Sequence, residues 1–174
     1  MTHQESIASA NYIIENINKN NIEDLTNLKL QKLLYFAYGV HLSLFNQKLF
    51  DSKIEAWQHG PVVPDVYQEF KSFGKNKINS SSRAVILKND YSGEIEIPMI
   101  NEISQENIAK SLFIACASYG DKSAWDLVEM LHHGDKSAWK KHYNQNKKGV
   151  IIPYEDIILE FEIHMDQIAT NILG

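Results

Sequence analysis

The chain has 174 residues, which is enough for one domain with a sizeable core, and its 44% hydrophobic and 22% charged residues are ordinary for a globular protein. Its 17 lysines and arginines against 22 aspartates and glutamates give a net charge of −5, which argues against nucleic acid and anionic membrane surfaces as partners. The single cysteine, Cys116, excludes an internal disulfide and a multi-cysteine zinc site.

The first part of the chain predicts two helices. Thr2 and Glu5 have the spacing of a capping box, and a helical stripe of apolar residues follows until the polar stretch at 18–21. Thr26 is a candidate cap for a second helix, which Gly39 interrupts. That glycine suggests either close packing of another backbone or a slight kink. The core face of this helix would use Leu30, Leu33, Leu34, Ala37, Leu42 and Phe45.

A short strand and a proline-clamped corner are expected next. Lys53–Trp57 has the composition of a strand. Gly60 and Val63 each precede a proline, which favours extended backbone at both positions. Pro64 suits the first turn of a helix, because its missing N–H would have no partner there, and Gly74 can end that helix.

The middle of the chain predicts a loop and a hairpin. Residues 75–83 are polar and serine-rich, and the segments 84–87 and 94–98 alternate like strands around the turn sequence NDYSG. Ser104 is then a candidate cap for a helix that continues to Tyr119 and ends at Gly120.

The hexapeptide GDKSAW occurs twice, at 120–125 and 134–139. Each copy would end one helix at its glycine and cap the next helix through Asp121 or Asp135. We interpret the repeat as one helix-junction sequence used twice, and not as a solenoid. Pro153 opens the last helix, whose apolar stripe would be Ile158, Phe161, Met165, Ile168 and Ile172.

These elements predict a single domain over residues 1–174. Its fold class would be mainly α (α+β): a compact helical domain with a small antiparallel β-sheet inserted in the middle. No apolar run approaches the roughly 18 residues of a membrane-spanning helix, and the first residues lack the pattern of a secretory signal. We therefore expect a cytoplasmic protein with no membrane partner.

Catalytic and cofactor motifs are not evident. The adjacent His132 and His133 would point about 100° apart on a helix, so they are poorly placed to share a metal ion. His59 stands beside the rigid corner, but no nucleophile or carboxylate has a recognisable spacing to it. Cys116 falls in a core stripe, which favours an inert thiol. We expect no enzyme activity, no cofactor and no metal, although a hydrolase that uses His59 and His133 remains an alternative.

Basic and aromatic residues admit two interpretations. Lysines gather between 136 and 148 beside Trp139 and Tyr143, which is compatible with a nucleic-acid patch or with a solvated helix face, and the net charge favours the second. Most large aromatic residues should be in the core. Those exposed beside the proline corner would be good anchors for a protein partner, because aromatic side chains bury a large area at low entropy cost.

Residues 28–39, LKLQKLLYFAYG, followed by IEAWQHGPVVP at 54–64 and the FG at 73–74, resemble the signature of the Panacea domain. This antitoxin family includes SocA-like and phage-associated GepA-like proteins. The resemblance covers residues 8–73 well and 104–162 more loosely, where LVEMLHHGDKSAWKKHY is similar to a second family element. Here His132 replaces a threonine of that element and Ala138 replaces its proline.

The resemblance implies a bacterial, prophage-associated antitoxin of a toxin–antitoxin system, with a part in phage defence. Such a protein would neutralise a cognate toxin, encoded by an adjacent gene, by direct binding. The alternatives are a proteolytic adaptor that delivers the toxin to a cytoplasmic protease and a phage-associated hydrolase. The candidate partner-binding residues are the corner and its flanking aromatic residues: Trp57, His59, Gly60, Pro61, Val62, Val63, Pro64 and Tyr67. We expect them to be exposed and rigid, and the alternative is that they only shape the core.

Overall fold

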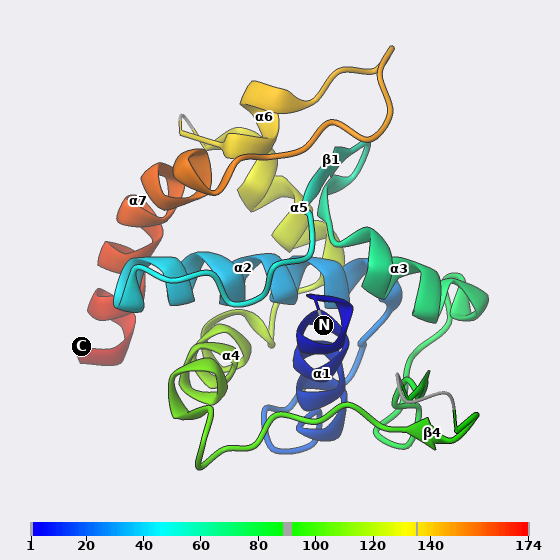
Figure 1. Ribbon diagram of the computed structural model, residues 1–174. Coiled ribbons are helices and arrows are strands. Elements are labelled where there is room, and N and C mark those ends of the chain that lie inside the picture. The colour runs from blue at the N-terminus through cyan, green and yellow to red at the C-terminus, as the bar shows by residue number, and fades with distance from the viewer. Residues whose placement is uncertain (1, 89–91, 135, 174) are drawn as a thin grey trace.

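The computed structural model describes residues 2–88, 92–134 and 136–173 and is mainly helical, as predicted. Helix α2 (Asn27–Phe45) runs through the centre. Around it lie α1 (Thr2–Glu15), α4 (Glu106–Tyr119), α5 (Ala124–His133) and α7 (Tyr154–Leu173) (Figure 1). Every residue of α2 from Lys29 to Leu42 is buried. The helix therefore has no solvent face over this length, and its apolar stripe is only part of what it buries.

The ends and the glycine of α2 have clear physical causes. Thr26 Oγ1 accepts a hydrogen bond from the Lys29 N–H at 3.3 Å, which confirms the predicted cap. Asn46, in the left-handed region with φ +52°, ends the helix. A Cβ on Gly39 would lie 2.2 Å from Cδ2 of Phe161 on α7. The close neighbour is thus an aromatic ring, and the expected backbone contact is wrong.

The proline corner is the second half of a β-hairpin. Strands β1 (Glu55–Trp57) and β2 (Gly60–Val62) pair antiparallel, with Trp57 opposite Gly60. The first strand begins two residues later than predicted. Val63 has the extended backbone expected before a proline, but the same expectation is wrong for Gly60, whose φ of +101° is a conformation that glycine allows. Pro64 lies in the first turn of α3 (Pro64–Phe70), which continues into the 3-10 turn η1 (Lys71–Phe73) and ends at Gly74.

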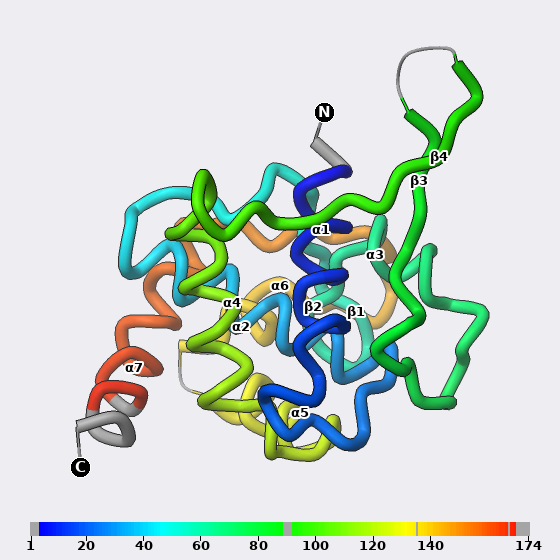
Figure 2. Tube along the Cα trace, turned by 90° about the horizontal axis from the view of Figure 1, so that it is seen from below, coloured from blue at the N-terminus to red at the C-terminus, as the bar shows by residue number. Residues whose placement is uncertain are grey.

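A second hairpin, also predicted, is formed by β3 (Ile86–Leu87) and β4 (Ile95–Glu96). Figure 2 shows it projecting from the helical body. Residues 89–91 of its expected turn lie outside the described residues. The described part of the chain therefore contains two small antiparallel sheets, where the sequence predicted one sheet with a preceding single strand.

Serines, and not the expected aspartates, cap the helices after the two GDKSAW repeats. Ser123 and Asp126 form a complete capping box for α5, so the expected cap at Asp121 is wrong because it comes two residues too early. Ser137 caps α6 (Ala138–His142) by accepting from the Lys140 N–H at 3.1 Å. Asp135 lies outside the described residues. Both copies place a glycine at the end of one helix and a serine cap at the start of the next, but the backbone differs, because Gly120 is helical (ψ −26°) and Gly134 is extended (ψ 136°).

Of two other predicted caps, the one at Ser104 is wrong and the one at Thr2 lies outside the described residues. Helix α4 begins after Gln105 and has no side-chain cap, because Ser104 precedes it in a turn where the Asn101 carboxamide accepts the N–H of Ser104 at 3.0 Å. The side chains of Thr2 and Ile172 are outside the described part of the structure. In α7, Ile157, Phe161 and Ile168 face the core. None of the described helices is long and apolar enough to cross a bilayer.

Candidate functional site

Four polar side chains of the LKLQKLLY segment are buried, and each fixes a different part of the chain to α2. They are Lys29, Gln31, Lys32 and Tyr35, all 1% exposed or less. A buried polar group is destabilising unless it is hydrogen-bonded, so each of these residues requires a partner at a defined place. Their partners identify what the central helix holds in position.

Gln31 and Lys32 form hydrogen bonds with the backbone of the proline corner. Gln31 Oε1 accepts the Val63 N–H at 2.9 Å, and its amide nitrogen donates to Asn27 Oδ1 at 3.0 Å. Lys32 Nζ donates to the Pro61 carbonyl at 2.8 Å. Burial lowers the pKa of Lys32 to about 7, because the ammonium has left water without gaining a counter-ion.

The same lysine explains the glycine of the corner. Gly60 has φ +101°, and a Cβ on it would lie 3.0 Å from both Cε and Nζ of Lys32. A side chain would therefore be strained by the backbone conformation and would also press on the buried lysine. The turn thus depends on a residue of α2 that is remote from it in sequence.

Lys29 and Tyr35 extend this support to the C-terminal half. Lys29 Nζ donates to the Gly120 carbonyl at the end of α4 at 2.7 Å and also bonds Asp24. The Tyr35 hydroxyl donates to Glu160 Oε2 on α7 at 2.6 Å. Burial raises the pKa of Glu160 to about 7. The LKLQKLLY segment is therefore an internal scaffold.

Above this scaffold, four side chains from the hairpin, α3 and α5 form what we call the hairpin surface: Trp57, His59, Tyr67 and Trp125. The rings of Trp57 and Tyr67 meet edge to face with centroids 4.8 Å apart. The rings of His59 and Trp125 do the same at 5.2 Å. Trp57 and Tyr67 are half-buried. His59 and Trp125 are exposed, and Trp125 has 56% of its surface accessible to solvent. Tryptophan this exposed, with its ring orientation set by a neighbour, is typical of a binding anchor.

Trp139 of the second repeat is hydrogen-bonded to the backbone of the hairpin. Its indole N–H donates to the Trp57 carbonyl at 2.6 Å. Its ring stacks on His132 at 3.7 Å and on Tyr143 at 4.8 Å. Burial lowers the pKa of His132, so the imidazole is stacked in its neutral form.

The structure divides the eight predicted site residues into two groups. Gly60, Pro61, Val62 and Val63 are buried, so the expectation that the corner itself is exposed is wrong. The reason is that Gln31 and Lys32 hydrogen-bond its backbone from inside the core. Pro64 is half-buried in the first turn of α3. Trp57, His59 and Tyr67 reach the surface, where Trp57 contacts Tyr67 and His59 contacts Trp125. Whether they contact a partner remains a prediction.

Trp125 is the residue that the sequence did not single out. It appeared only as one of the large aromatic residues, most of which were expected in the core. The equivalent residue of the second repeat, Trp139, is 8% exposed. Each tryptophan follows a serine cap near the start of its helix, and the packing of that helix against the rest of the chain makes one tryptophan external and the other internal.

The histidines of the hydrolase alternative have separate partners. His133 Nε2 lies 2.7 Å from Glu129 Oε2 on the exposed side of α5, whereas His59 packs on Trp125. Cys116 is buried, and burial raises the pKa of its thiol. The described ranges contain no group of three or more His, Cys, Asp or Glu side chains that could hold a metal ion. The arrangement provides a surface for binding, and it does not bring His59 and His133 to a shared partner.

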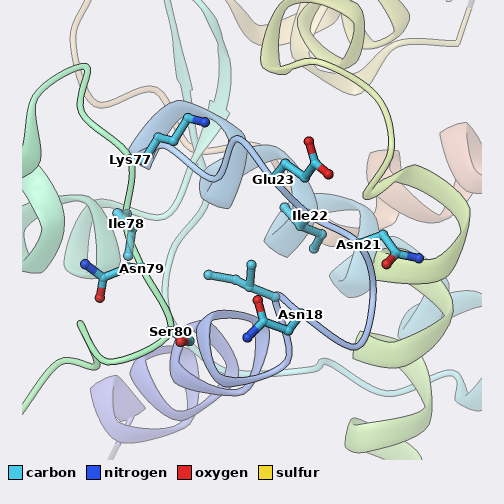
Figure 3. A pocket seen from close by; sticks show the side chains of 9 residues that line it. Asn18, Asn21, Ile22, Glu23, Lys77, Ile78, Asn79 and Ser80 are labelled. Carbon is cyan, nitrogen blue, oxygen red and sulfur yellow. The ribbon is translucent and has the colours of Figure 1, made fainter.

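A separate polar hollow lies between the turn after α1 and the loop at 77–80, with a volume of about 430 Å³ (Figure 3). Asn18, Asn21 and Asn79 point their carboxamides around its rim. Asn79 Oδ1 already accepts the Ser81 hydroxyl at 2.6 Å and the Ser82 hydroxyl at 2.9 Å within its own loop. The hollow is shallow loop packing and offers less specific chemistry than the hairpin surface.

Comparison with known proteins identifies the same region. The family model described as "Antitoxin SocA-like, Panacea domain" matches residues 30–140, which run from α2 through the hairpin to α6. Antitoxin SocA of Caulobacter vibrioides is 33% identical over 108 residues, which cover 62% of this chain and 55% of that protein. The chain thus spans about half the length of this curated relative. No solved structure matches.

Proposed function

Because the chain belongs to the SocA-like Panacea antitoxin family, we propose that it is the antitoxin of a toxin–antitoxin pair and neutralises a protein toxin by binding it directly. We place this encounter in the cytoplasm and expect the toxin to be encoded by an adjacent gene. The role is non-enzymatic: the chain would cover the active surface of the toxin.

The observation that carries this proposal is the hairpin surface. Its aromatic rings are oriented by one another, and the backbone that bears them is bonded to buried groups of α2. A preformed surface loses little conformational entropy on binding, so more of the contact energy is retained as affinity. An exposed tryptophan at its edge supplies the large apolar contact that dominates many protein interfaces.

The test is co-expression with the neighbouring gene. Expression of that gene alone should stop growth, and the chain should restore it. Trp125→Ala should abolish the rescue while the melting temperature stays unchanged, because this side chain is 56% exposed. His59→Ala should weaken the rescue in the same way.

Phe113→Ala is the matched control, because Phe113 is 55% exposed but lies on α4, on the other side of α2 from the hairpin (Figure 1). This variant should rescue like the wild type. Full rescue by a Trp125→Ala, His59→Ala double variant would place the toxin elsewhere on the molecule. Absence of any toxic neighbour would contradict the antitoxin role itself.

Delivery of the toxin to a cytoplasmic protease is the second mechanism that the family implies, and the same strains distinguish it. Under simple sequestration, the amount of toxin in the cell is unchanged when the chain is present. Under delivery, the amount of toxin falls and recovers when the protease gene is deleted. Immunoblots of the toxin with and without the protease gene separate the two mechanisms.

A further inference from the structure

A cavity of about 220 Å³ lies between α5, α6 and α7 and contains a buried carboxylate. Helix α6 contacts both α5 and α7. The side chains that line it are Met130, Lys136, Ser137, Glu160, Ile163 and His164.

Glu160 offers one acceptor atom to this cavity. The residue is 4% exposed, and its Oε2 accepts the Tyr35 hydroxyl at 2.6 Å and the Ala138 N–H at 3.2 Å. Among the described residues, no donor bonds its other oxygen, Oε1, which is 4.0 Å from His164 Nε2. A carboxylate oxygen in such a place attracts a donor, and a cationic donor most strongly.

The other walls select the class of ligand. Met130 and Ile163 are apolar, and burial lowers the pKa of His164, so the imidazole is neutral and does not compensate the carboxylate. Lys136 at the rim is directed to Glu162, 3.4 Å away. An anion would meet Glu160 at close range and is disfavoured, whereas a cation with an apolar stem fits both the walls and the acceptor.

We propose that this cavity receives an arginine side chain of the bound protein partner, whose guanidinium pairs with Glu160 Oε1 while its methylene groups pack on Met130 and Ile163. The identity of that partner as a toxin rests on the proposed function, but the chemistry of the cavity does not. Guanidinium is more weakly hydrated than ammonium and presents several donors in one plane, so it loses less on entering a narrow, partly apolar site.

Binding should depend on pH in a defined direction. The pKa of Glu160 is raised to about 7, so the carboxylate is mostly protonated at pH 6 and mostly ionised at pH 8. A cation binds the ionised form, so affinity should rise about tenfold between these values. The groups that face Glu160 are Tyr35, His164 and Lys136, with Asp156 one turn away on α7. Tyr35 stays neutral in this range because burial raises its pKa, and burial lowers the pKa of His164, which favours the neutral imidazole.

The test is a titration of the whole chain with N-acetyl-L-arginine amide, followed by NMR of the His164 ring and the Ile163 methyl groups. N-acetyl-L-citrulline amide has the same shape without the charge and is the control probe. Saturable shifts with the arginine probe, about tenfold tighter at pH 8 than at pH 6 and absent with the citrulline probe, are expected. Equal binding of both probes would overturn the proposal.

Two variants locate the site. Glu160→Gln keeps an acceptor for Tyr35 and Ala138 but removes the charge, and should weaken the arginine probe at least tenfold. Ile163→Trp fills the mouth of the cavity and should do the same if Glu160→Gln fails to fold. Glu155→Gln, an exposed change on the same helix, should bind like the wild type. Unchanged affinity in either cavity variant refutes the site.

The titration needs no toxin, so its outcome is independent of the antitoxin role. If the probe binds through Glu160 but no neighbouring toxin is neutralised, the cavity stands and the proposed function fails. If toxin is neutralised but neither probe binds, the proposed function stands and the arginine site is wrong.

Discussion

Lys32 allows the energetic cost of the internal scaffold to be measured. Its ammonium is fully buried, and its pKa falls from 10.5 to about 7. Each pKa unit corresponds to about 1.4 kcal/mol, so at pH 7 the 3.5-unit difference from the unfolded chain destabilises the fold by roughly 4 kcal/mol. Replacing the lysine with methionine keeps the stem and removes the ionisable group. It also leaves the Pro61 carbonyl without its donor, which costs about 1 to 3 kcal/mol.

The pH dependence separates these two effects. Between pH 7 and 10.5 the unfolded chain holds a proton on Lys32 that the folded chain has lost, so the stability of the wild type rises with pH. Lys32→Met lacks this term, whereas the lost hydrogen bond to Pro61 does not depend on pH. The advantage of Lys32→Met over the wild type should therefore shrink by about 2 kcal/mol between pH 7 and pH 9.

Urea unfolding followed by tryptophan fluorescence at pH 7, 8 and 9 measures this difference. Lys75→Met, a substitution at an exposed position, is the control and should follow the wild type at every pH. Parallel stability curves for Lys32→Met and the wild type would show that Lys32 is charged in the folded protein, and the argument from burial would be refuted.

Three further substitutions test the packing. Gly39→Ala puts a Cβ 2.2 Å from the Phe161 ring and should destabilise by about 1 to 3 kcal/mol in thermal unfolding, with partial recovery when Phe161→Leu is added; an unchanged melting temperature would contradict this contact. Ser123→Ala should cost about 1 kcal/mol by loss of the α5 cap, whereas Asp121→Ala should be nearly neutral; the reverse order would restore the cap that the sequence suggested. Trp139→Phe keeps the ring stacking but loses the indole bond to the hairpin, so urea unfolding should show a loss of about 1 kcal/mol, and no change would mean that water replaces that bond.

The LKLQKLLY segment shows why a family signature need not mark a contact surface. Gln31, Lys32 and Tyr35 are buried, and each positions a segment that is remote in sequence. Substituting any one of them leaves a buried group without its partner, so such residues are constrained by folding alone. We expect residues outside the scaffold, such as the exposed Trp125, to contact a partner.

The sequence by itself determined the helices, the second hairpin, the strand β1 and the fold class, because apolar periodicity, prolines and glycines act on local backbone. It located α2, α4 and α7, the caps at Thr26 and Gly74, and the helix junctions at the two GDKSAW copies. These properties depend on neighbours within a few positions, and such neighbours can be read directly from the chain.

Only the tertiary structure decided which polar residues are inside and which aromatic residues are outside. Tyr35 and Glu160 are hydrogen-bonded although 125 positions separate them in the sequence, and nothing in the local pattern of either residue predicts the pair. The proline corner, expected at the surface, is buried because α2 supplies one donor, Lys32, and one acceptor, Gln31, to its backbone. Trp125 and Trp139 occupy identical hexapeptides, yet one is exposed and the other covered. Burial is a property of the packed assembly, so the same local sequence has different exposure wherever different elements pack against it.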